Sequence, residues 1–247
     1  MILAVNIGNT NIAIGFFNDN NLTVKRYSHK KCELHEEFVN SFRSDISATK
    51  EITSIAIASV VPRLTHVISY ILLKETGKQP LIIDTSMDLG LDFSAYDSSL
   101  LGIDRLLCCV AALKKYESPA IIFDLGTAIT VNVINKEACF IGGVILPGVQ
   151  MGLEALTKGT ALLPKGDLLA PSTVIGNNTA TCLTSGAIYG TASIIEGMAR
   201  RIEDELGYKC LAIITGGNAE DIIPYSDVDL IYEPNLLLEG IKEIVKV

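Results

Sequence analysis

The chain begins with runs of apolar residues that are divided by short polar turns, and the same pattern returns near its middle. Apolar runs of this length, bounded by Gly, Asn and Asp, are typical of β-strands. Strands are expected over residues 2–7, 12–17 and 22–27, and again over 120–124, 128–135 and 139–145. The polar run Asn18-Asp19-Asn20-Asn21 predicts a hairpin turn in the first set. The repetition indicates two related halves.

The segments that follow each set of strands predict helices and buried strands. Helices are expected at about 34–43, 62–75, 103–116, 149–156, 178–206 and 236–245, and further strands at 54–60, 81–83 and 211–215. The longest helix is expected to break near Gly186 or Gly190. We interpret 87–101 and 164–171 as loops. This order of elements predicts an α/β fold with mixed sheets, whose halves comprise residues 1–117 and 118–247.

The composition narrows the possible functions. Hydrophobic residues make up 49% and charged residues 19% of the 247 positions, which is enough apolar material for a large core. A net charge of −8 without a basic stripe argues against a nucleic-acid partner. The N-terminus lacks the features of a signal peptide, and residues 183–198 are too polar for a membrane span. We therefore expect a soluble, cytoplasmic protein with no membrane partner.

The cysteines and histidines show no metal-ligand spacing. None of the six cysteines forms a C-x-x-C pair, and the three histidines lie near no cysteine cluster. Cysteines in mostly apolar surroundings are typical of free thiols in a reducing compartment rather than of disulfides or a zinc site. The residues concerned are Cys32, Cys108, Cys109, Cys139, Cys182 and Cys210, and His29, His35 and His66.

Two Gly/Thr turns stand at matching places in the two halves. The first is Asn6-Ile7-Gly8-Asn9-Thr10 and the second is Asp124-Leu125-Gly126-Thr127, each between two expected strands. Such a turn exposes backbone N–H groups and a hydroxyl, which can bind phosphate oxygens. Either turn alone could be an ordinary hairpin, but the pair favours a nucleotide held between two halves. Asp124 is a candidate cation ligand, or alternatively an Asx-turn residue.

Further candidate chemistry lies at two helix starts. In Gly102-Ile103-Asp104-Arg105, the carboxylate could act as a general base for phosphoryl transfer to an alcohol, or could only cap the helix. Thr215-Gly216-Gly217 offers more backbone N–H groups, or is simply a tight turn. The chain contains no Walker A sequence, no Gly-x-Gly-x-x-Gly after a strand and no Gly-x-Ser-x-Gly. These absences weaken the P-loop NTPase, Rossmann and hydrolase interpretations.

Taken together, these segments resemble the type III pantothenate kinases of the actin/hexokinase-like ATPase superfamily over essentially the whole chain. The motifs of that family are D-x-G-N-T, G-A-D-R and D-x-G-T-A, followed by a P-G turn, an L-E-A-L helix and later Gly-rich segments. In this chain they correspond, in order, to Asn6–Asn11, Gly102–Arg105, Asp124–Ala128, Pro147-Gly148, Leu153–Leu156, Ile175–Thr179, Ser185-Gly186 and Thr215–Ala219.

The resemblance implies both a fold and an activity. The fold is a pair of ribonuclease H-like, actin-like ATPase halves with a nucleotide cleft between them. The activity is ATP-dependent phosphorylation of pantothenate to 4'-phosphopantothenate, the first step of coenzyme A biosynthesis. Asp104 would be the general base. Pantothenate would be bound by Tyr96, Gly102, Ile103, Asp104, Arg105 and Thr179, and ATP by Asn6, Ile7, Gly8, Asn9, Thr10, Asn11, Ile12, Ala13 and Thr127.

The resemblance also implies cofactors and an assembly. Mg²⁺ would accompany ATP, and Asp124 would bind a monovalent cation, K⁺ or NH₄⁺. Members of the family are homodimers that bind pantothenate near the subunit interface.

The chain departs from the family pattern at three positions. Asn6 stands where the family has Asp, Ile103 replaces a small Ala, and Thr184 replaces Gln. Loss of the carboxylate at position 6 removes a negative charge near the metal and phosphates. The alternative to an active kinase is therefore a weakened kinase-fold paralogue that binds ligand and has a regulatory role.

Overall fold

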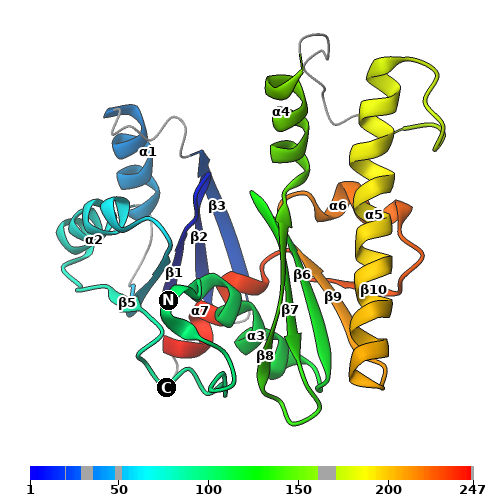
Figure 1. Ribbon diagram of the computed structural model, residues 1–247. Coiled ribbons are helices and arrows are strands. Elements are labelled where there is room, and N and C mark those ends of the chain that lie inside the picture. The colour runs from blue at the N-terminus through cyan, green and yellow to red at the C-terminus, as the bar shows by residue number, and fades with distance from the viewer. Residues whose placement is uncertain (20, 29–35, 48–51, 161–170, 246–247) are drawn as a thin grey trace. The chain divides into compact units, whose positions relative to one another are not determined.

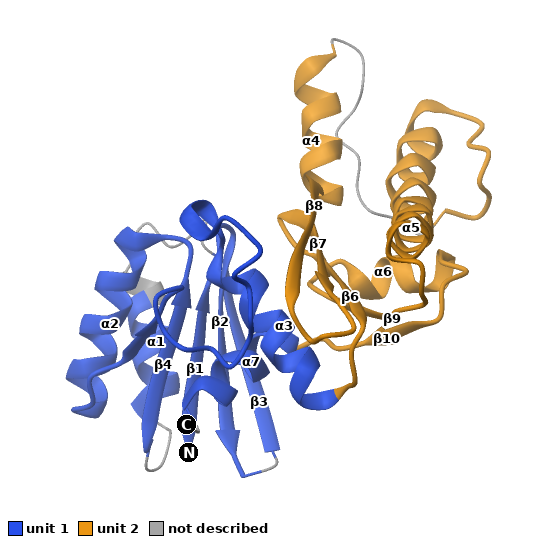
Figure 2. Cartoon of the chain, turned by 60° about the horizontal axis from the view of Figure 1, so that its bottom comes forward, with its two compact units in different colours: residues 1–115, 236–247 blue, residues 116–235 orange. Residues whose placement is uncertain are grey.

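The computed structural model describes residues 1–19, 21–28, 36–47, 52–160 and 171–245. The chain divides into two compact units, coloured separately in Figure 2. Unit 1 comprises residues 1–115 and 236–247, and unit 2 comprises residues 116–235.

Unit 1 is built on a five-stranded mixed sheet in the order β3-β2-β1-β4-β5 (Figure 1). The first three strands are antiparallel neighbours, whereas β4 and β5 run parallel to β1. The strands are β1 (Ile2–Ile7), β2 (Asn11–Asn18), β3 (Asn21–Ser28), β4 (Ser54–Ser59) and β5 (Leu81–Ile83). The helices are α1 (Glu36–Ser47), α2 (Pro62–Thr76), α3 (Ile103–Lys115) and α7 (Leu236–Val245), with a 3₁₀ turn, η2 (Ser98–Leu100).

The two faces of this sheet carry side chains of different size. Large residues such as Leu3 and Val5 point to the face covered by α1 and α2 and form one core. Small buried residues, among them Ala4 and Ala58, point to the opposite face, against which α7 packs. Small side chains let the helix approach the sheet closely, so α7 is held against β1 and β4 of unit 1.

Unit 2 repeats the topology of unit 1. Its sheet has the order β10-β9-β6-β7-β8, in which β6, β7 and β8 are antiparallel neighbours and β9 and β10 run parallel to β6. The strands are β6 (Ala120–Leu125), β7 (Ala128–Ile134), β8 (Phe140–Pro147), β9 (Leu211–Thr215) and β10 (Leu230–Tyr232). The helices are α4 (Val149–Gly159), α5 (Thr179–Leu206) and α6 (Ala219–Ile222), with a 3₁₀ turn, η3 (Ile223–Tyr225). The predicted duplicated α/β fold with mixed sheets is confirmed.

The long helix α5 differs from its prediction because it is continuous. Asn178 caps its N-terminus by accepting from the Thr181 backbone, and Gly207 ends it in the left-handed conformation. The break expected near Gly186 or Gly190 was wrong. A helical glycine lowers stability but keeps the helical dihedrals when the rest of the helix is packed, as the inner face of α5 is.

Three further differences concern boundaries. The short strand β10 was missed because only three half-buried residues form it. Helix α1 continues to Ser47, whereas residues 34–35 and most of the loop expected at 164–171 lie outside the described residues. Helix α7, expected in the second half, belongs to unit 1 because its apolar face packs on β1, β4 and α3.

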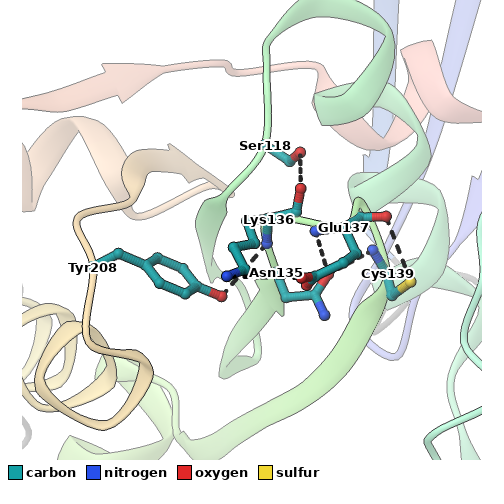
Figure 3. A network of polar contacts seen from close by, with 6 residues as sticks. All are labelled: Ser118, Asn135, Lys136, Glu137, Cys139 and Tyr208. Carbon is teal, nitrogen blue, oxygen red and sulfur yellow. Dashed lines mark hydrogen bonds and ion pairs between the residues drawn. The ribbon is translucent and has the colours of Figure 1, made fainter.

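The turn between β7 and β8 is fixed by polar contacts (Figure 3). The side-chain oxygen of Asn135 accepts from the backbone N–H of Glu137 (3.1 Å) and of Cys139 (2.9 Å). The Lys136 carbonyl accepts from Ser118, and the Lys136 N–H donates to the hydroxyl of Tyr208. These bonds connect the hairpin to the segment before β6 and to Tyr208, two residues after the end of α5.

Two expectations from the sequence concern membrane-spanning helices and the state of the cysteines. In the part of the chain described, no helix is long and apolar enough to cross a membrane. The five cysteines that the structure describes are free, with Cys108 and Cys109 buried and Cys182 exposed.

The crossing of α7 over α3 depends on Gly240. A Cβ at this position would lie 2.1 Å from the Leu107 carbonyl oxygen. We predict that Gly240→Ala lowers the free energy of unfolding by about 1–3 kcal/mol, because the helices must separate. Gly190→Ala is the matched control, since a Cβ there meets nothing within 4 Å. It should be neutral or stabilise by up to about 1 kcal/mol. Urea denaturation measures both, and equal midpoints would refute the close crossing.

Candidate active site

The two Gly/Thr turns occupy equivalent places, each joining the first two strands of its sheet. In unit 1 the Gly8 amide donates to the Asn11 carbonyl (3.0 Å), and in unit 2 the Gly126 amide donates to the Ala128 carbonyl (3.0 Å). The residues that flank each turn are paired across the two strands, Ile7 with Ile12 in unit 1 and Leu125 with Ile129 in unit 2. The predicted repetition of the turns is therefore confirmed as a feature of the fold, while phosphate binding stays a prediction.

The unit 2 turn is held against the start of α4. A Cβ on Gly148 would lie 2.2 Å from the Thr127 carbonyl oxygen and 2.6 Å from that of Gly126. Only glycine fits there, so the turn and the N-terminus of α4 are in backbone contact. Thr127 itself is exposed at the tip.

The Gly102–Arg105 segment begins α3. Asp104 is the second residue of the helix, and its Oδ1 accepts from the Arg105 backbone N–H (2.9 Å). A Cβ on Gly102 would lie 2.4 Å from this same oxygen. Glycine at 102 therefore leaves room for the carboxylate to fold back over the chain. Oδ1 accepts a hydrogen bond from the backbone at the start of the helix, which leaves Oδ2 as the oxygen that can accept a proton.

The environment of Asp104 favours its neutral form. Burial raises the pKa of this carboxyl above its usual range, while the Arg105 N–H bond and the Arg105 charge oppose the rise. A carboxyl group with a raised pKa is a stronger base when ionised, which suits proton removal from an alcohol.

Arg105 is buried beside this carboxylate. Only 6% of its surface is exposed, its Nη1 donates to the Tyr96 hydroxyl (3.4 Å), and its guanidinium lies 5.7 Å from the centre of the Tyr96 ring. One turn further along α3, burial raises the pKa of the Cys109 thiol to about 12. That thiol is protonated at neutral pH and is not a nucleophile. Ile103 is buried too, so only its backbone is available to a ligand.

Asp124 lies in a row of oxygen-bearing side chains. It is paired in register with Thr130 on β7 and with Thr215 on β9. These three side chains point away from the core face that α5 covers. A Cβ on Gly216, whose φ is +97°, would lie 2.6 Å from Asp124 Oδ1, so the carboxylate leans toward the end of β9. Among the described residues, no three His, Cys, Asp or Glu side chains gather as a metal-ligand group.

An apolar groove of about 520 Å³ lies within unit 2 between α4 and α5. Gly148 and Thr179 are part of its lining, so the groove extends from the unit 2 turn to the first residue of α5. Its other lining residues are Pro147, Val149, Gly152, Leu153, Leu156, Cys182, Leu183, Gly186, Ala187 and Thr191. Sequence reasoning missed this groove, although Gly148, Gly152 and Gly186 are the small residues that leave space for it.

The predicted site residues thus lie in three groups, two in unit 1 and one in unit 2. In unit 1, Tyr96, Gly102, Ile103, Asp104 and Arg105 form one cluster at the start of α3, and Asn6–Ala13 form the end of β1 and the turn into β2. In unit 2, Asp124 and Thr127 flank Gly126, and Thr179 lines the adjoining groove. Thr130 was not predicted, and Thr215 was singled out only for the backbone N–H groups of the turn that it begins. The signal of both residues is a hydroxyl in strands that are otherwise mainly apolar.

Comparison with solved structures shows which proteins share this fold. A conserved putative Baf family transcriptional activator from Campylobacter jejuni aligns with a TM-score of 0.60, at 22% identity, over 99% of this chain and 97% of its own. A putative 2-dehydro-3-deoxygalactonokinase from Sinorhizobium meliloti aligns with a TM-score of 0.57, at 11% identity, over 100% and 96%. At these identities the matches concern the fold alone. With the duplicated sheets, they show that this chain shares the two-unit α/β fold of these proteins.

Sequence comparison then defines the family. The family model described as type III pantothenate kinase matches residues 2–201. Proteins with that name from Moorella thermoacetica and Persephonella marina are 34% and 36% identical, over 98% and 99% of this chain and 97% and 98% of their own lengths. The chain belongs to the type III pantothenate kinase family, and the resemblance seen in its motifs is confirmed.

The raised pKa of Asp104 has a consequence for stability. The contribution of the Asp104 carboxyl group to the free energy of unfolding is fully present at low pH and is lost as the pH rises through its folded-state pKa, so this group stabilises the fold less at neutral pH than in acid. We predict that Asp104→Asn raises the melting temperature at pH 7, and that this gain disappears as the pH falls below the pKa of the folded protein. Differential scanning calorimetry across pH measures it.

Asp97→Asn is the control, because the pKa of Asp97 is shifted in the opposite direction to that of Asp104. The Ser99 amide lowers the pKa of the exposed Asp97 carboxyl, which therefore stabilises the fold above its unfolded pKa and ceases to do so in acid. This variant should gain nothing at pH 7. An Asp104→Asn protein that melts at or below the wild-type temperature at pH 7 would contradict the burial argument.

Proposed function

We propose that this chain transfers the γ-phosphoryl group of ATP to the primary hydroxyl of pantothenate and thereby forms 4'-phosphopantothenate for coenzyme A synthesis. The observation that carries the proposal is Asp104, a largely buried carboxylate with a raised pKa and one oxygen fixed at a helix start. Membership of the family supports the choice of substrates.

The proposed reaction needs one proton acceptor. The hydroxyl oxygen of pantothenate attacks the γ-phosphorus, the bond from that phosphorus to the β–γ bridging oxygen breaks, and ADP leaves. The hydroxyl proton passes to Oδ2 of Asp104, because Oδ1 is already bonded to the Arg105 amide. Tyr96, Arg105, the backbone of Gly102 and Ile103, and Thr179 would hold pantothenate. The Tyr96–Arg105 contact supports this, since it keeps a cation beside the base.

ATP would be held by Asn6–Ala13 and by Thr127. Both segments include exposed turn residues next to a strand end, as phosphate contacts by backbone N–H groups require. Mg²⁺ bound with ATP would neutralise charge on the phosphates. Asp124 would hold a monovalent cation, K⁺ or NH₄⁺. The donor set fits such an ion, because it contains a single carboxylate with two neighbouring hydroxyls.

We further propose a cytoplasmic homodimer. Apolar side chains are exposed on unit 2, with Leu156, which lines the groove, at 47%, and Val174 and Ile175, in the segment before α5, at 61% and 85%. Large exposed apolar side chains are typical of contacts between subunits when they form a patch. Thr179 lines the same groove, which supports a substrate site close to that contact.

The replacement of Asp by Asn6 is the one observation that favours a weakened, ligand-binding paralogue. Asn6 is the fifth of six residues in β1, as Asp124 is in β6, so the two residues are structural equivalents. Loss of a carboxylate at such a position could reduce the rate by about 30- to 1000-fold.

The first test of the proposal is Asp104→Asn. The amide keeps the hydrogen bond to the Arg105 amide but is not a base, so kcat should fall by about 10²- to 10⁴-fold while the affinity for ATP is nearly unchanged. Steady-state kinetics and a nucleotide-binding titration measure the two quantities, and Asp97→Asn controls for the loss of one negative charge. If Asp104 only capped the helix, kcat would stay at the wild-type value, because Asn caps as well as Asp.

The second test is Asn6→Asp. A carboxylate at this strand end would interact with Mg²⁺ or its water more strongly than an amide does, so kcat/KM should rise about ten- to a thousand-fold. Titration of Mg²⁺ at fixed ATP should show a lower requirement for the metal. Unchanged kcat/KM and Mg²⁺ dependence would mean that Asn6 is an adapted residue, and would remove it as evidence for a weakened paralogue.

A further inference from the structure

The chain reverses its direction as it enters α5, so that residues 174–178, termed the entry segment, run back along the helix. The carbonyl of Val174 accepts a hydrogen bond from the hydroxyl of Ser185. A Cβ on Gly176 would lie 2.4 Å from the amide nitrogen of Cys182. The entry segment therefore lies antiparallel to the first two turns of α5. Figures 1 and 2 both show it on the side of α5 that faces away from α4.

The first turn of α5 is held by polar contacts. In the part of the chain that the structure describes, its residues 179–182 are all exposed, and the first buried residue of the helix is Ser185. The Asn178 side chain accepts from the Thr181 amide (3.0 Å). The Thr181 hydroxyl accepts from the amides of Asn177 (3.0 Å) and Asn178 (3.1 Å). A helix end without apolar packing frays readily, so such contacts decide how well the turn is ordered.

The Ser185 hydroxyl anchors the entry segment to the buried part of the helix. Ser185 is 6% exposed, whereas Val174 is 61% exposed, so the bond joins a fixed donor to a segment at the surface. Without this hydroxyl the Val174 carbonyl can turn to water, because exposed backbone groups are readily solvated. The chain would then be free to enter α5 from another direction.

The residue placed by this contact is Thr179. It is the first residue of α5 and lines the groove between α4 and α5. We propose that Ser185 is a positioning residue, whose bond to the Val174 carbonyl keeps the first turn of α5 folded and thereby holds Thr179 at the groove. The consequence for pantothenate rests on the proposed function, in which Thr179 contacts that substrate.

Hydrogen exchange followed by mass spectrometry tests the positioning without any substrate. The amides of Asn177, Asn178, Thr181 and Cys182 are all hydrogen-bonded at the start of α5. In the Ser185→Ala chain this turn opens more often, so its amides should exchange about three- to tenfold faster than in the wild-type chain.

Thr184→Ala is the matched control for the loss of one hydroxyl. Thr184 directly precedes Ser185, but its hydroxyl donates to the Ala180 carbonyl of the same helix (3.0 Å). Its removal does not release the entry segment, so exchange over residues 177–182 should stay at the wild-type rate. Circular dichroism checks that each variant is folded.

Steady-state kinetics tests the consequence for the substrate. When the first turn is ordered for only part of the time, the apparent affinity for pantothenate falls by the ordered fraction. KM for pantothenate should therefore rise about three- to tenfold in Ser185→Ala, while kcat and KM for ATP change by less than about twofold. A purely structural defect would instead lower kcat through loss of folded enzyme and leave both KM values unchanged. Thr184→Ala should keep the wild-type constants.

A double-mutant cycle tests whether Ser185 acts through Thr179. Thr179→Ala alone should raise KM for pantothenate, and the addition of Ser185→Ala should raise it no further, because the group to be positioned is already gone. Two independent effects would multiply.

Four results would overturn the positioning role: unchanged exchange in Ser185→Ala, equally fast exchange in Thr184→Ala, faster exchange with an unchanged KM for pantothenate, or multiplied effects in the cycle. A wild-type chain that does not phosphorylate pantothenate refutes the proposed function instead. The exchange rates of Ser185→Ala and Thr184→Ala then decide the positioning role by themselves.

Discussion

The alternation of side chains along the first strand of each sheet determines where the polar groups of this protein lie. Helices α1 and α2 cover one face of the unit 1 sheet and α5 covers one face of the unit 2 sheet, and these faces take the large apolar residues of β1 and β6. The opposite face of the unit 1 sheet carries small residues under α7. The fifth residue of each strand, Asn6 or Asp124, therefore points to the other face, at the end of the strand where the chain turns. A shift of one residue in register would move both into the helix-covered cores.

Glycines then set how closely the backbone segments approach these strand ends. Gly148 brings α4 against the unit 2 turn, Gly102 gives the Asp104 carboxylate room to bond its own helix, and Gly216 lets Asp124 lean toward β9. In each case a Cβ would lie closer than 3 Å to the group that it meets. The polar chemistry proposed for this chain depends on these contacts more than on long-range charge, because the net charge of −8 repels an anionic substrate.

Much of the fold could be predicted because apolar runs and turn residues are local signals. The first three strands, the repeat in unit 2 and the segment of α5 were all visible in the pattern. The placement of α7 could not be predicted, because α7 packs on α3 through a contact between Gly240 and Leu107, which are distant in sequence. For the site, the Gly/Thr turns and Asp104 were marked by their motifs. Thr215 was marked only as part of a Gly-rich turn, because its pairing with Asp124 depends on the register of two strands that are distant in sequence.

The family gives the expected substrates, while Asn6 gives the reason to measure them directly. The most direct test is a steady-state reaction of the purified chain with ATP, Mg²⁺, K⁺ and pantothenate, in which the product is identified by mass spectrometry and ADP is counted. The proposed function predicts 4'-phosphopantothenate in one-to-one ratio with ADP, formed at a rate that saturates with pantothenate. ADP formation that does not depend on pantothenate, or no phosphorylated product after prolonged incubation, would contradict it.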